Sequence, residues 1–131
     1  MDLFRSIFSP FSRSVPKRVS GSLPVHFAGA IGAEWTSNDE IYEAIFYHDD
    51  IEKIARFDKE GTLIEYRVNI NPDQIPSPIR EAVAAELEIM NCIAVYTSEK
   101  LNYELIVRDR KFVRYLLMLD SLGNSLLSEQ L

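Results

Sequence analysis

The sequence predicts an α+β fold in which a helix followed by a four-stranded antiparallel sheet occurs twice, with both helices on one face of a combined sheet. Runs rich in β-branched and aromatic residues alternate with short turn signals, as antiparallel hairpins require. The pattern of residues 40–65 also returns at 101–127, where Asp120–Gly123 corresponds to the turn Asp58–Gly61. The predicted organisation is an N-terminal tail at 1–14, a first repeat at 15–70, a linker at 71–74 and a second repeat at 75–131.

The tail has an apolar pattern typical of one face of a short helix, which Pro10 disfavours extending. The apolar residues are Leu3, Phe4, Ile7, Phe8 and Phe11. Two interpretations remain open. The segment is either a loosely ordered or packed terminus, or a helix that docks on a membrane surface or a partner.

The first repeat opens with apolar residues at four-residue intervals from Val15 to Phe27, and Pro16 suits a first helical turn. Gly21 and Pro24 weaken this helix, so a short, kinked or broken helix is expected. The predicted strands of this repeat are 33–36, 41–47, 51–57 and 63–68.

The second repeat has a cleaner helical pattern, with one apolar stripe and polar faces over residues 75–90. The stripe consists of Ile75, Ile79, Val83, Leu87 and Met90. The predicted strands of this repeat are 93–97, 103–108, 112–119 and 125–127.

Alternation within the strands divides the side chains between two faces. Tyr42, Ala44 and Phe46 are assigned to the helix-covered face, as are their counterparts in residues 103–107. The opposite face mixes aromatic, aliphatic and charged residues, which suits protein contact. The candidate binding residues are Glu43, Ile45, Tyr47, Arg56, Glu104, Ile106, Arg108 and Tyr115.

Bulk composition excludes several classes of protein. A formal net charge of −6 and a pI near 4.9 argue against nucleic acid as a partner. No apolar run approaches the roughly 18 residues that span a bilayer. The N-terminal residues do not have the pattern of a signal peptide, which by itself favours the cytoplasm.

No pattern in the sequence indicates an enzyme, a metal centre or a cofactor. His48-Asp49-Asp50 and Asp58–Gly61 are typical of turns, and neither has the spacing of metal ligands. Cys92 is the single cysteine, and its apolar neighbours favour a buried small side chain over a nucleophile. No nucleophile elbow, P-loop or dinucleotide fingerprint is present. We therefore predict no catalytic residues, no metal ligands and no cofactors.

Several of these segments resemble the PepSY-like repeat of small bacterial proteins, which share the tandem fold of β-lactamase-inhibitor protein. The resemblance covers about residues 15–127 and is weaker in the second copy. It rests on Val15-Pro16, Val19, Phe27, Ala30, Glu34-Trp35, Tyr42-Glu43-Ala44-Ile45-Phe46 and Phe57-Asp58-Lys59-Glu60-Gly61. It implies a non-enzymatic, extracytoplasmic binding protein, periplasmic or secreted, with inhibitory roles among related folds.

Three functions follow from these observations. The first is a protein-binding or inhibitor-like module that uses the open sheet face and the hairpin loops. The second is a carrier or sensor of a small apolar ligand in a groove between sheet and helices, which requires a pocket of roughly 300 Å³ or more. The third is a scaffold that forms a weak homodimer through an edge strand.

Overall fold

The computed structural model describes residues 9–10 and 15–131. The chain divides into two compact units, the first ending at Val68 and the second spanning Asn69–Leu131. Most of the predicted tail lies outside the described residues. Its described part is strand β1, Ser9–Pro10, which pairs with β2.

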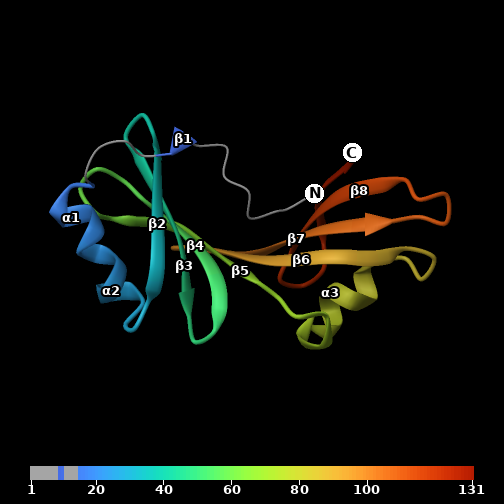
Figure 1. The fold of residues 1–131 in the computed structure, drawn as a ribbon. Helices are drawn as coiled ribbons and strands as arrows, with labels where there is room; N and C mark the ends of the chain where they lie inside the picture. The colour runs from blue at the N-terminus through green and yellow to red at the C-terminus, as the bar shows by residue number, and fades with distance from the viewer. Residues whose placement is uncertain (1–8, 11–14) are drawn as a thin grey trace. The chain divides into compact units, whose positions relative to one another are not determined.

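The first unit is mainly antiparallel sheet. Its strands are β2 (Ile31–Asn38), β3 (Ile41–His48), β4 (Ile51–Phe57) and β5 (Leu63–Asn69), and each pairs antiparallel with the next along the chain. The short helices α1 (Lys17–Ser20) and α2 (Ser22–His26) precede them (Figure 1). The connections are short hairpins, because Asp49 and Asp50 between β3 and β4 adopt the positive φ angles, 54° and 62°, of a tight turn.

The broken first helix is confirmed. Gly21 separates α1 from α2 and caps both. The two pieces bury Val19, Leu23 and Phe27 against Ala44 and Phe46 of β3 in one apolar cluster. The assignment of Ala44 and Phe46 to the helix-covered face is therefore correct, and burial of this face holds the helices on the sheet.

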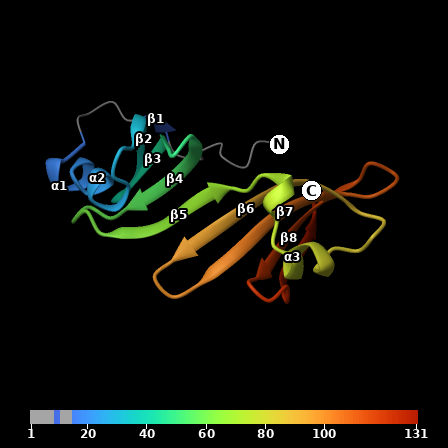
Figure 2. The same ribbon diagram turned by 90° about the horizontal axis from the view of Figure 1, so that it is seen from below.

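The second unit is also mainly antiparallel sheet. It contains the 3₁₀ turn η1 (Pro72–Gln74), helix α3 (Ser77–Ala82) and strands β6 (Glu88–Thr97), β7 (Leu101–Arg108), β8 (Arg114–Asp120) and β9 (Ser125–Gln130). Strands β6 to β9 pair antiparallel in chain order. The loop between β7 and β8 lies at the same end of the unit as the segment that follows α3 (Figures 1 and 2).

The predicted fold class is wrong. The chain is mostly antiparallel sheet, and the helices of the described residues are only four, five and six residues long, too short for a tandem unit of one helix and four strands. The helix expected over residues 75–90 ends at Ala82, because Val83 is extended and β6 begins at Glu88. Met90 therefore belongs to a strand, where it is 43% exposed, and not to a helical stripe. Pairing of residues 88 and 89 with β7 overrides the helical propensity of Ala84, Ala85 and Leu87.

Two turn glycines allow their loops to pack closely against the helices. Gly61 and Gly123 have φ angles of 86° and 91°. A Cβ on Gly61 would lie 2.2 Å from the Arg18 carbonyl oxygen, and one on Gly123 would lie 2.6 Å from the Pro78 carbonyl oxygen. Both the backbone conformation and the close approach require glycine here.

No helix in the described part of the chain is long and apolar enough to cross a membrane.

Candidate functional site

Four of the predicted binding residues lie on strands of the first unit and four lie on strands of the second. Glu43, Ile45 and Tyr47 lie on β3, and Arg56 lies opposite Glu43 on β4. Glu104, Ile106 and Arg108 lie on β7, and Tyr115 lies on β8 opposite Val107. Glu43 and Ile106 are buried, Tyr47 is 48% exposed, and the other five are half-buried.

A charge ladder crosses β3, β4 and β5 on the face opposite the helices. The Arg56 Nε donates to Glu43 Oε2 at 2.8 Å, and its Nη1 lies 3.2 Å from Glu65 Oε2. Arg67 Nε lies 3.2 Å from the same Glu65 oxygen. The Glu43 side chain is fully buried, and within the described residues its Oε1 has no hydrogen-bond partner. This ladder keeps a buried carboxylate paired, so its first role is structural.

Sequence reasoning named Glu43 and Arg56 but missed Glu65 and Arg67. The signal that finds them is the hairpin register, which places Glu43, Arg56 and Glu65 in one row across three strands. Opposite charges in directly paired positions stabilise a sheet. Because the turns fix the register of the two hairpins, this row of charges could have been predicted from the sequence.

The β3–β4 corner carries the most exposed of the predicted residues. Tyr47 pairs across the sheet with Ile31, which is 66% exposed, and Ile51 follows the turn at 39% exposed. Ile51 pairs with His48, so its side chain lies on the other face of the sheet, and we call Ile31 and Tyr47 the corner patch. The Tyr47 hydroxyl donates to Glu52 Oε2 at 3.2 Å, and this contact with a carboxylate raises the pKa of Tyr47. An exposed aromatic ring beside an exposed isoleucine is a suitable anchor for protein contact.

His48, within this corner, has structural contacts. Its Nδ1 lies 2.8 Å from Lys53 Nζ and 3.5 Å from an Asp49 carboxylate oxygen, and its ring stacks edge-on against Phe27 at 5.7 Å. Throughout residues 9–10 and 15–131, no group of three His, Cys, Asp or Glu side chains is placed to hold a metal ion.

The β7–β8 loop brings two predicted residues, Arg108 and Tyr115, beside one that sequence reasoning missed. Phe112 is 72% exposed and has a φ angle of 64°. Asp109 holds the turn, since its Oδ1 accepts from the Lys111 and Val113 amides at 2.8 and 3.0 Å. These backbone hydrogen bonds, with the one from Val113 foremost, lower the pKa of Asp109.

The signal that finds Phe112 is the turn pattern itself. Asp58 and Asp120 accept two backbone amide hydrogen bonds on one carboxylate oxygen just as Asp109 does, and the third residue after each is a glycine. Phe112 occupies that third position after Asp109. An aromatic side chain therefore stands where two equivalent turns use glycine.

Arg108 contacts the Phe112 ring, and further charged residues lie in the same hairpin. The guanidinium of Arg108 lies over the ring, 5.0 Å from its centroid, and donates to Glu88 Oε2 at 2.6 Å. Arg108 pairs directly with Arg114 across the hairpin, an arrangement of like charges that destabilises a sheet. The Tyr115 hydroxyl donates to Asp109 Oδ2 at 3.3 Å, and burial together with this carboxylate raises the pKa of Tyr115.

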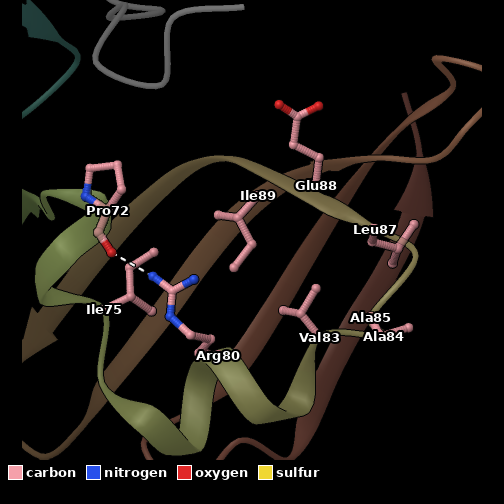
Figure 3. Close-up of a pocket in the computed structure, with 9 residues that line it drawn as sticks. All are labelled: Pro72, Ile75, Arg80, Val83, Ala84, Ala85, Leu87, Glu88 and Ile89. Carbon is pink, nitrogen blue, oxygen red and sulfur yellow. Dashed lines mark hydrogen bonds between the residues drawn. The ribbon is translucent and has the colours of Figure 1, made fainter.

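A shallow pocket of about 380 Å³ lies in the second unit between η1, α3 and the start of β6. Figure 3 shows Arg80 extending from α3 toward Pro72, whose carbonyl oxygen accepts a hydrogen bond of 2.5 Å from Arg80 Nη2, with Ile75, Val83 and Ile89 providing apolar walls. The lining residues are Pro72, Ile75, Arg80, Val83, Ala84, Ala85, Leu87, Glu88 and Ile89. The volume meets the requirement stated for a small-ligand carrier.

The fold resembles those of solved bacterial structures. A candidate periplasmic protein of Bacteroides eggerthii superposes with a TM-score of 0.81 at 18% identity, over 90% of each chain. A DUF2874 family protein of Bacteroides uniformis gives 0.81 at 17% identity, over 89% of this chain and 90% of that one. A β-lactamase-inhibitor-protein-like protein of Bacteroides fragilis gives 0.79 at 13% identity, over 91% of this chain and 88% of that one.

These likenesses confirm that the fold is similar to that of a β-lactamase-inhibitor-protein-like protein. No family model matches the sequence, and no curated protein matches it.

Proposed function

We propose that this chain is a non-enzymatic protein-binding module, inhibitor-like in character, of the PepSY-like kind. The observation that carries the proposal is the corner patch, where exposed Ile31 of β2 pairs with exposed Tyr47 of β3 next to the β3–β4 turn. Tyrosines supply large contact area at low entropic cost, and a few such anchors dominate many interfaces. A charged group borders the patch, because the Glu52 carboxylate accepts a hydrogen bond from the Tyr47 hydroxyl.

The compartment proposed for this function is the periplasm or the outside of the cell. The support comes from the structural neighbour described as a candidate periplasmic protein and from the PepSY-like resemblance.

The test is a binding measurement on a purified pair. A partner captured from the source organism is purified, and its Kd for the wild-type chain is compared with that for Tyr47→Ala and Arg108→Ala. Loss of the Tyr47 ring should weaken binding at least about tenfold, as for a central aromatic anchor. Ile64→Ala is the matched control, because Ile64 is 41% exposed on β5 of the same unit but lies away from the corner patch. An unchanged Kd for Tyr47→Ala would remove the proposal in this form.

A second candidate function is a carrier or sensor of a small apolar ligand, favoured by the 380 Å³ pocket. Arg80 would fix a ligand carboxylate while Ile75, Val83 and Ile89 contact its apolar part. The fluorescence of 1-anilinonaphthalene-8-sulfonate should rise on binding, and Ala85→Trp, which adds a large side chain to the pocket lining, should abolish the rise. If the dye responds equally to both proteins, the pocket is not the ligand site.

A further inference from the structure

The tip of the β7–β8 hairpin, residues 108–114, combines two local features that cost stability. Phe112 holds a left-handed backbone conformation that disfavours side chains, and Arg108 lies directly opposite Arg114. A strained residue and a repelling pair in one short hairpin indicate a role other than stability.

The charge of this tip is opposite to that of the unit that carries it. Residues 69–131 contain six Lys and Arg, of which four lie at 108–114: Arg108, Arg110, Lys111 and Arg114. The same unit contains nine Asp and Glu, of which only Asp109 lies in the tip, where its carboxylate accepts hydrogen bonds from two backbone amides and from Tyr115. An anionic surface would therefore attract the tip and repel the rest of the unit, which sets the orientation of approach.

Three of the four cations are available to such a surface. Arg110, Lys111 and Arg114 are exposed, and within the described part of the chain none of them has an ion-pair partner. Arg108 instead donates a hydrogen bond to Glu88 Oε2 at 2.6 Å, and its guanidinium lies over the Phe112 ring, 5.0 Å from the centroid. The tip therefore presents one exposed aromatic ring together with three exposed cationic side chains.

We infer that the β7–β8 tip docks on an anionic lipid bilayer, with Phe112 entering the interface and Arg110, Lys111 and Arg114 contacting lipid phosphates. A bilayer interface accepts a single protruding ring with long cationic side chains around it, and it needs no complementary pocket. Basic clusters of this size are attracted to anionic bilayers. This inference goes beyond the proposed function, because it gives the second unit a docking role that does not use the corner patch.

The experiment measures cosedimentation of the full chain with vesicles of phosphatidylcholine alone and of phosphatidylcholine with phosphatidylglycerol at equal parts. Wild type should bind the phosphatidylglycerol vesicles and not the neutral ones, and excess inorganic phosphate should not compete. Phe112→Ala should lower the partition coefficient by about tenfold, the loss expected for an inserted aromatic side chain. Arg110→Glu with Lys111→Glu should lower it by at least about tenfold.

Two further variants separate docking from folding. Phe112→Gly keeps the turn, since glycine accepts the φ angle of 64°, yet it should lose vesicle binding as Phe112→Ala does. Leu122→Ala is the matched control: Leu122 is 77% exposed on the β8–β9 turn, which has the same Asp-anchored geometry without the basic cluster. It should change the partition coefficient by less than about twofold.

Absence of binding to the phosphatidylglycerol vesicles would overturn the inference. So would a Phe112→Ala variant that keeps vesicle binding but weakens the complex with the captured protein, because the tip would then be a protein contact. Failure of the corner patch in the Tyr47→Ala test leaves the vesicle result unaffected, so the two proposals fail separately.

Discussion

The phenyl ring of Phe112 is exposed on a turn whose backbone is costly for any side chain to occupy. We predict that Phe112→Gly raises the free energy of unfolding by about 1 kcal/mol, because glycine removes the left-handed penalty. Chemical denaturation in urea measures this change. A variant less stable than wild type would mean that the stacking of Arg108 on the ring outweighs the backbone cost.

At Cys92, burial raises the pKa of the thiol to about 11. The folded state favours the neutral thiol, so this group's contribution to stability is present below the ordinary thiol pKa and is lost as the pH rises toward 11. We predict that native protein at pH 8 reacts with a chromogenic disulfide reagent at least about a hundredfold more slowly than protein in urea. Equal rates would contradict the burial of this side chain.

Glu43 and Arg56 form a pair in which the carboxylate is fully buried and the arginine is 30% exposed. We predict that Arg56→Ala lowers the free energy of unfolding by about 2 kcal/mol, a value reduced for the exposure of the arginine. Adding Glu43→Gln to Arg56→Ala should recover part of this loss, because the unpaired buried charge is then removed. Urea denaturation of both variants checks the sign, and a further loss in the double variant would contradict the account.

Among the elements, the strands could be predicted from the sequence far better than the helices. The run at 51–57 has the bounds of β4, and the runs at 41–47 and 63–68 differ from β3 and β5 by one residue each. The helix over 75–90 could not be predicted correctly, because the apolar spacing of Leu87 and Met90 fits a helix, whereas strand β6 begins at Glu88 and pairs with β7. Local pattern carries no information about such a distant partner.

The candidate site was predicted only in part. Alternation along β3 exposes Tyr47 in the structure, but the same rule also selected Glu43 and Ile106, which are buried. Alternation along one strand predicts which side chains share a face of the sheet, but it does not predict whether other residues bury that face. Phe112 was missed because its positive φ angle is a property of the backbone that the sequence does not give directly. Comparison with the Asp-x-x-Gly pattern of the two other turns could have identified it.

The turn glycines give a test at the level of elements. We predict that Gly61→Ala lowers the free energy of unfolding by more than about 2 kcal/mol, since it adds a clash with the Arg18 carbonyl to the backbone penalty. Gly29→Ala is the matched control: it has the same φ angle of 86° with no atom within 4 Å of the added Cβ, so it should lose only about 1 kcal/mol. If urea denaturation gives equal losses of stability for the two variants, the close packing of the Gly61 turn against α1 does not contribute to stability.

For the molecule as a whole, the weak homodimer through an edge strand stays a prediction. Strand β9 pairs with β8, all six of its residues are exposed, and Leu126 is 53% exposed. Such a strand can template pairing with a second copy. Light scattering over a range of concentrations should show the mass rise toward that of two chains, and Leu126→Lys should suppress the rise. A constant monomer mass would remove this prediction.

The central claim is that the corner patch contacts a partner protein. Amide hydrogen exchange on the complex with the captured partner tests it most directly, because it locates the contact without a substitution. We predict that protection increases on binding at Ile31 and Tyr47, with no change around α3 and the pocket. Protection confined to residues 72–89, with the corner patch unaffected, would contradict the claim and favour the pocket instead.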